Sequence, residues 1–195
     1  MLAASLCVAG PAVAETNISK AQAVAVPFDK CKPEKGVTVT FDDSSPKLSG
    51  EEIAQLLTGN TLLSVDRYGT FALYYPEKGK AIGWMPKEKD KGYSWSAGKV
   101  SFEGGKYCRT WDQWNSGKYV NCWNIYRSAE PHVDRPGFYF ACENGVPDGD
   151  IHVVLPGNYF EVEWRGTGKK GGRLTQSDEK TNAATEKYFG KYVNK

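Results

Sequence analysis

Apolar and polar residues alternate with a period of two along most of the chain between Asn60 and Trp164. Glycine, proline and asparagine residues interrupt this alternation at short, regular intervals, as they do between strands of a β-sheet. The pattern predicts a succession of short strands at Thr61–Val65, Thr70–Tyr75, Ala81–Met85, Gly92–Ala97, Lys99–Phe102, Tyr107–Trp111, Tyr119–Arg127, Gly137–Cys142, Ile151–Leu155 and Tyr159–Trp164.

Short strands joined by tight turns favour an antiparallel meander, because consecutive strands can then pair directly. Closing the meander into an up-and-down barrel would remove its exposed edges. A β-sandwich is the alternative that the same pattern allows. We therefore predict a mainly β protein whose barrel domain occupies residues 47–164.

A short helix is predicted directly before the first of these strands. Ser49 is followed three residues later by Glu52, which is the spacing of a capping box. Ile53, Leu56 and Leu57 form a short apolar face, and Gly59 ends the segment. We expect this helix to cover one end of the β core.

The segments that flank the barrel domain have a different pattern. Residues 15–46 are predicted to form an N-terminal arm with one strand at Val37–Phe41. Residues 165–195 begin as a basic, glycine-rich linker and continue as a C-terminal helix from Ser177 to about Tyr192. This tail carries a net charge of +5 and the rest of the chain −3. We expect a solvated, mobile end, with attachment to an anionic surface or an envelope protein as the alternative.

The first 14 residues resemble a secretion signal. They carry no charge, and Ala12-Val13-Ala14 matches the small-residue pattern that precedes signal cleavage. The positively charged N-terminal region that usually precedes the apolar stretch of such leaders is missing. We expect cleavage before Glu15 and export of the protein to the periplasm or the medium.

Composition narrows the class of protein further. The 195 residues include 21 Gly, 10 Pro, 6 Trp, 11 Tyr and 8 Phe, a mixture that suits aromatic strands and turns rather than helices. No stretch approaches the roughly 20 apolar residues that a spanning helix needs, which excludes a transmembrane helix. The net charge of +2 gives no general case for nucleic-acid binding.

Cysteine count and spacing predict disulfides. Removal of the leader leaves Cys31, Cys108, Cys122 and Cys142, which in an exported protein fit two bridges with three pairings. Cys108 and Cys122 lie on successive predicted strands, so we favour a bridge between them. The two remaining cysteines, Cys31 and Cys142, would then form the second bridge. Paired cysteine or histidine spacings of a zinc site are missing, and we expect neither a metal nor a cofactor.

An ordered set of residues across the strands resembles a family of small secreted bacterial proteins, the domain-of-unknown-function family 995. The set consists of Leu57-Thr-Gly-Asn-Thr61, Gly69 with Tyr74-Tyr75, Gly92 with Trp95, Tyr107-Cys108 with Trp111, and Cys122. The resemblance covers roughly residues 48–156 and implies a small calycin-like or lipocalin-like barrel with a helix near its start. It implies no activity, and it leaves the 111–123 segment and the basic tail unexplained.

Candidate catalytic residues are few. His132 lies in the segment 130–136 between two prolines, which we interpret as a rigid loop, and Asp134 is its nearest acidic neighbour downstream. A hydrolase built on this pair is the least favoured hypothesis, because a general base needs a positioned partner and a substrate pocket.

The strongest local signal is a cluster of aromatic and amide side chains. Its members are Trp111, Gln113, Trp114, Tyr119 and Trp123. Flat aromatic faces beside amides suit stacking on sugar rings or enclosure of a flat apolar molecule. We therefore predict an exported, non-catalytic binding protein for a small apolar ligand or a glycan, using the barrel mouth or this hairpin. The alternative is a periplasmic interaction factor, an inhibitor or an envelope-assembly protein, that docks through its tail.

Overall fold

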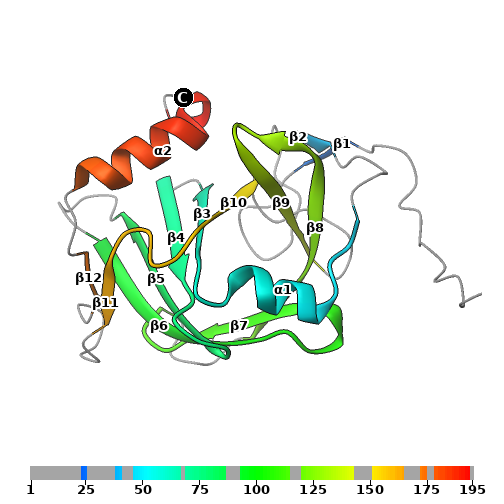
Figure 1. Ribbon diagram of the computed structural model, residues 1–195, viewed down its shortest axis with the longest axis horizontal. Helices are drawn as coiled ribbons and strands as arrows, with labels where there is room; N and C mark the ends of the chain where they lie inside the picture. Colours follow the sequence, from blue (N-terminus) through cyan, green and yellow to red (C-terminus); the bar gives the residue numbers. More distant parts are fainter. Residues whose placement is uncertain are drawn as a thin grey trace, which may run out of the picture.

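The structure, a computed structural model, describes residues 23–25, 38–40, 46–66, 69–86, 93–114, 120–142, 151–164, 172–174 and 178–193. Figure 1 shows how their elements are arranged. The elements are β1 (Ala23–Ala25), β2 (Thr38–Thr40), α1 (Gly50–Leu57), β3 (Thr61–Asp66), β4 (Gly69–Tyr74), β5 (Lys80–Pro86), β6 (Tyr93–Ser101), η1 (Glu103–Gly105), β7 (Tyr107–Trp111), β8 (Asn121–His132), β9 (Arg135–Ala141), β10 (His152–Leu155), β11 (Val162–Trp164), β12 (Gly172–Leu174) and α2 (Asp178–Val193).

Strands β3 to β10 form a closed antiparallel barrel in which each strand pairs with its neighbours along the chain. The ring closes between β10 and β3, where Val153 pairs with Leu63 and Leu155 with Thr61. Closure leaves no free edge between these eight strands. The predicted mainly β, up-and-down barrel is confirmed, and the sandwich alternative is excluded.

The barrel interior is filled by large apolar side chains. Cross-strand partners such as Leu62 with Leu73, and Ile125 with Phe140, lie on the inner face of the sheet. All four are buried, and they belong to one continuous cluster. Burying each such side chain stabilises the fold by roughly 1.5–3 kcal/mol, so alternation along the strands drives closure of the barrel.

Helix α1 lies across one end of the ring of strands (Figure 1). The predicted capping box is present: Ser49 Oγ accepts from the Glu52 N–H at 3.2 Å, and Glu52 Oε2 accepts from the Ser49 N–H at 2.8 Å. Ile53 and Leu57 are fully buried in the interior cluster. Because β7 starts beside η1 at this end, Trp111 and the turn that follows it lie at the opposite end.

Strand β6 corrects one sequence prediction. The two strands predicted on either side of Ala97-Gly98 are a single strand, and Gly98 pairs with Ala81 and Trp111 in the middle of it. A Cβ atom at Gly98 would lie 2.6 Å from both the Thr110 carbonyl oxygen and the Trp111 ring. This glycine therefore allows close packing and makes no turn.

A second apolar cluster lies on the outer side of the barrel, where α2 covers it. Ala184, Tyr188 and Phe189 of α2 pack with outward-facing barrel residues, among them Trp84 and Val153. The predicted C-terminal helix is confirmed, but the expected solvated end is wrong for α2, because these three side chains are buried.

Four short strands of the described residues lie outside the barrel, in two separate pairs. The strand predicted at Val37–Phe41 is confirmed as β2, which pairs with β1. The last of the predicted strands is β11, which pairs with β12 and takes no part in the ring. Strand β12 falls in the segment that the sequence predicts as a linker.

Candidate functional site

Two of the predicted ligand-binding tryptophans are interior residues of the barrel. Trp111 on β7 is 5% exposed and Trp123 on β8 is 4% exposed, and both belong to the interior cluster. Trp123 packs against Tyr107, with ring centres 5.7 Å apart. These indoles form the wall of the barrel and do not stand on its outer surface.

Trp114 lies in the turn after β7 and is only half-buried. Its ring meets Trp111 edge-on, with centres 4.8 Å apart, and approaches Phe71 at 5.8 Å. Its indole N–H donates to Ser94 Oγ at 2.9 Å. The side chain is thus fixed at the barrel end opposite α1.

Gly83 on β5 provides the room that these two indoles occupy. A Cβ atom there would lie 2.8 Å from the Trp111 Cη2 atom and 2.9 Å from the Trp114 Cη2 atom. Because any larger residue would displace a ring, the glycine keeps both indoles together at this end.

Gln113 connects the same turn to β6. Its Oε1 atom accepts from the Ala97 N–H at 2.7 Å, and its own N–H donates to Ser96 Oγ at 3.1 Å. The amide side chain therefore stabilises the turn and positions Trp114. Tyr119, the remaining predicted binding residue, lies outside the described residues.

The predicted disulfide between Cys108 and Cys122 is present, across paired positions of β7 and β8. Cys142 is also disulfide-bonded. Its predicted partner, Cys31, lies outside the described residues.

Sequence reasoning missed Arg109, which is the most unusual residue of this region. It lies on β7 between Tyr107 and Trp111, on the same inward-facing side of the strand. Its guanidinium carbon lies 4.7 Å from the ring centre of Trp123, 5.1 Å from that of Phe71 and 5.3 Å from that of Trp111. A fourth ring, that of Tyr107, is 5.9 Å away.

The Arg109 guanidinium has aromatic neighbours but no acid. In the part of the chain that the structure describes, no carboxylate pairs with it, and its buried Nε atom has no hydrogen-bond partner. The residue as a whole is half-buried. The sequence pattern that could have identified Arg109 is its spacing: Tyr107, Arg109 and Trp111 are two residues apart on one predicted strand. Side chains at this spacing lie on the same face of a strand.

Two tyrosine hydroxyls form a buried pair beside this cation. Tyr75 Oη and Tyr107 Oη are 2.9 Å apart, and both side chains are fully buried. Burial, together with Tyr107, raises the pKa of Tyr75 well above its ordinary value, and the opposing effect of Arg109 is smaller. The Tyr75 hydroxyl therefore stays protonated at neutral pH.

The candidate hydrolase residues, His132 and Asp134, both contact α2. Residues 130–136 are not a loop, because β8 and β9 extend through them to a turn at Val133-Asp134. His132 Nε2 lies 2.6 Å from the Tyr188 carbonyl oxygen, and Asp134 pairs with Lys187 at 2.7 Å. Both residues therefore hold α2 against the tip of this hairpin.

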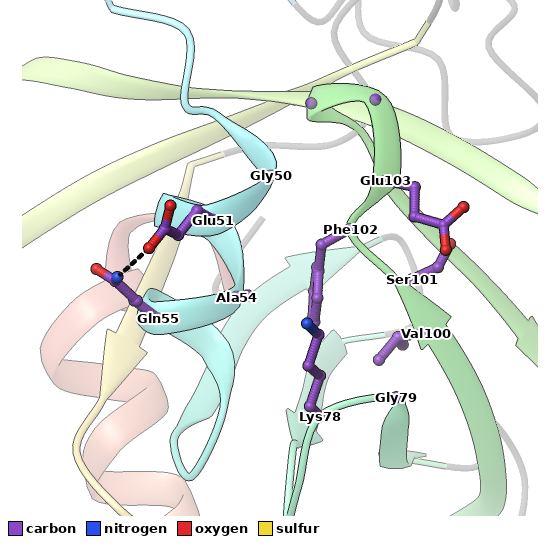
Figure 2. A pocket seen from close by; sticks show the side chains of 12 residues that line it. Gly50, Glu51, Ala54, Gln55, Lys78, Gly79, Val100, Ser101, Phe102 and Glu103 are labelled. Atoms are coloured by element: carbon purple, nitrogen blue, oxygen red, sulfur yellow. Dashed lines mark hydrogen bonds between the residues drawn. The ribbon is translucent and has the colours of Figure 1, made fainter.

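A groove of about 720 Å³ lies between α1, the Lys78–Gly79 turn and η1 (Figure 2). Phe102 is buried in its floor, and its charged residues, such as Glu51 and Glu103, are exposed. Glu51 already accepts a hydrogen bond from Gln55 at 3.2 Å. The groove thus offers no buried polar group that would fix a ligand.

Comparisons with protein-family models, with curated proteins and with solved structures find no match to this chain. The family resemblance in the sequence therefore stays a prediction. Within the described residues, no helix is long and apolar enough to cross a membrane. The same residues include no group of three or more His, Cys, Asp or Glu side chains that could hold a metal ion.

Proposed function

We propose that this protein is an exported, non-catalytic binding protein that takes a small ligand at the barrel end opposite α1. The observation that carries the proposal is the environment of Arg109: a half-buried cation among four aromatic rings, with a buried Nε atom that has no partner among the described residues. Ligand sites in proteins combine apolar and aromatic walls with a few polar groups of this kind.

The surrounding residues support a preformed site. Trp114 is held by Ser94, its turn is held by Gln113, and Gly83 leaves the space that its ring occupies. A binding surface built from side chains that are already fixed loses little conformational entropy when a ligand arrives. A flat apolar molecule and a sugar ring both suit the half-buried indole of Trp114.

Export is part of the same proposal. The uncharged leader predicts it, and the disulfide between Cys108 and Cys122 supports it, because such bonds persist in oxidising compartments. The alternative of an interaction factor that docks through its tail stays a prediction. The buried face of α2 is already occupied by the barrel.

Ligand titrations followed by tryptophan fluorescence and thermal shift test this function. A panel of neutral and charged naphthalene derivatives and of oligosaccharides samples both ligand types. We expect a saturable response, and we expect Trp114→Ala to weaken binding on the order of tenfold. Trp164→Ala is the matched control, because Trp164 packs in the outer cluster.

Two results would argue against a ligand site at this end. One is the lack of any response across the panel with the folded protein. The other is equal weakening by Trp114→Ala and Trp164→Ala, which would point to a general loss of stability.

A further inference from the structure

We infer that the ligand carries a carboxylate and that Arg109 binds it at the barrel end opposite α1. This inference rests on the proposed function and names the chemical class of its ligand. The guanidinium is the group that would select an anionic ligand over a neutral one, since the aromatic rings alone would accept neutral molecules.

The charge of Arg109 is only partly compensated by its neighbours. Aromatic faces attract a cation, but they offer no acceptors in the plane of the guanidinium N–H groups. The buried Nε–H therefore lacks an acceptor among the described residues. Leaving a charged donor unsatisfied away from water is costly, so an oxygen anion at this position would be strongly favoured.

The shape of the guanidinium favours a carboxylate. Its donors lie in one plane with a spacing that matches the two oxygens of a carboxylate, which can accept two parallel hydrogen bonds. The single negative charge of a carboxylate balances the single positive charge. The aromatic rings around the cation would pack against the apolar part of the acid.

The tyrosine pair supplies a second donor nearby. Two hydroxyls share one hydrogen bond between Tyr75 and Tyr107, so one hydroxyl hydrogen has no acceptor among the described residues. Tyr107 precedes Arg109 by two residues on the same face of β7.

The carboxylate could belong to an apolar acid or to an acidic sugar, and matched ligand pairs separate these sources. The first pair is 2-naphthoate and neutral 2-naphthamide, which share ring and size. The second pair is glucuronate and glucose. Calorimetric titration at pH 7, where both acids are ionised, gives four dissociation constants for the full chain.

We expect one acid to bind about tenfold or more tightly than its neutral partner, because a hydrogen bond to a charged group contributes that much. Arg109→Gln should abolish this preference, and Arg109→Lys should retain part of it. Arg135→Gln is the matched control, since Arg135 donates to Tyr188 Oη on the α2 contact, away from the barrel end.

Each other outcome has a distinct meaning. Equal binding of acid and neutral partner overturns the carboxylate inference and leaves the proposed function standing. An acid preference that survives in Arg109→Gln assigns the carboxylate to another residue and also overturns the inference. Binding of none of the four compounds removes the support for both. The comparison of acid and neutral ligands with the natural protein tests the carboxylate inference even if Arg109→Gln does not fold.

Discussion

The guanidinium carbon of Arg109 lies 4.7 Å from the ring centre of Trp123, inside the barrel. The two residues belong to neighbouring strands that the Cys108–Cys122 disulfide joins. In the register of β7 and β8, Tyr107 pairs with Trp123 and Arg109 with Asn121, on either side of the bridge. The covalent bond thus fixes the two strands that supply the cation and part of its aromatic surroundings.

Removal of this bridge should weaken the fold. The bond closes a loop between residues 14 apart, which on the chain-entropy model stabilises the folded state by about 3 kcal/mol. We expect the double variant Cys108→Ala, Cys122→Ala to lose about this much free energy of unfolding in urea titrations. The disulfide of Cys142 remains in this variant and serves as the internal reference. An unchanged midpoint would show that β-sheet pairing alone sets the distance between the strands.

Gly98→Ala tests whether this glycine is needed for packing. The added methyl group would lie 2.6 Å from the Thr110 carbonyl oxygen, which belongs to backbone and cannot move aside easily. We expect a loss of roughly 1–3 kcal/mol in unfolding free energy. Ser101→Ala, at an exposed position of the same strand, should change it by less than about 0.5 kcal/mol. Similar values for both variants would contradict the close approach.

Phe189→Ala tests whether α2 is part of the folded core. Phe189 is fully buried in the outer cluster, so its truncation should destabilise the protein by about 3–5 kcal/mol. Glu186→Ala on the exposed side of the helix is the control. If chemical denaturation finds the two variants equally stable, α2 does not pack as described.

The ion pair between Asp134 and Lys187 should be visible in the titration of the carboxyl group. The hydrogen bond from Lys187, with a smaller contribution from Tyr188, holds the pKa of Asp134 below its ordinary value. A lowered pKa means that the contact stabilises the fold above the pKa of Asp in the unfolded chain. This stabilisation is lost as the pH falls through the folded value.

Carbon-detected NMR titration of the Asp134 carboxyl measures this directly. We expect Lys187→Gln to raise the pKa of Asp134 toward the ordinary range, while Lys180→Gln, whose ammonium lies over Tyr159, leaves it in place. An Asp134 pKa that is the same in the natural protein and in Lys187→Gln would show that the pair does not form in solution.

Much of the barrel could be predicted because the patterns that form its strands and its first helix lie within short stretches of sequence. Alternation marks each strand, and the spacing of Ser49 and Glu52 marks the start of α1. Gly98 was misinterpreted because glycine serves turns and close packing equally well, and only the position of the Trp111 ring distinguishes the two. Asp134 and Lys187 are 53 residues apart, so no local pattern could pair them.

The candidate site was predicted in outline only. The sequence identified the aromatic segment, but it could not divide the tryptophans between the interior and the barrel end. Which tryptophans are buried in the interior depends on which face of β7 points into the barrel. Arg109 was overlooked because charged residues in strands usually point to solvent, although its position between Tyr107 and Trp111 places it on their face.

The most direct test of a carboxylate site at Arg109 is the Nε–H signal of this side chain in ¹H–¹⁵N spectra. The signal is assigned by its loss in Arg109→Lys and followed while 2-naphthoate or glucuronate is added. Binding at Arg109 predicts that the signal shifts and saturates together with the indole N–H signal of Trp114. An Arg109 signal that stays unchanged while the acid binds elsewhere, or while no acid binds at all, would contradict it.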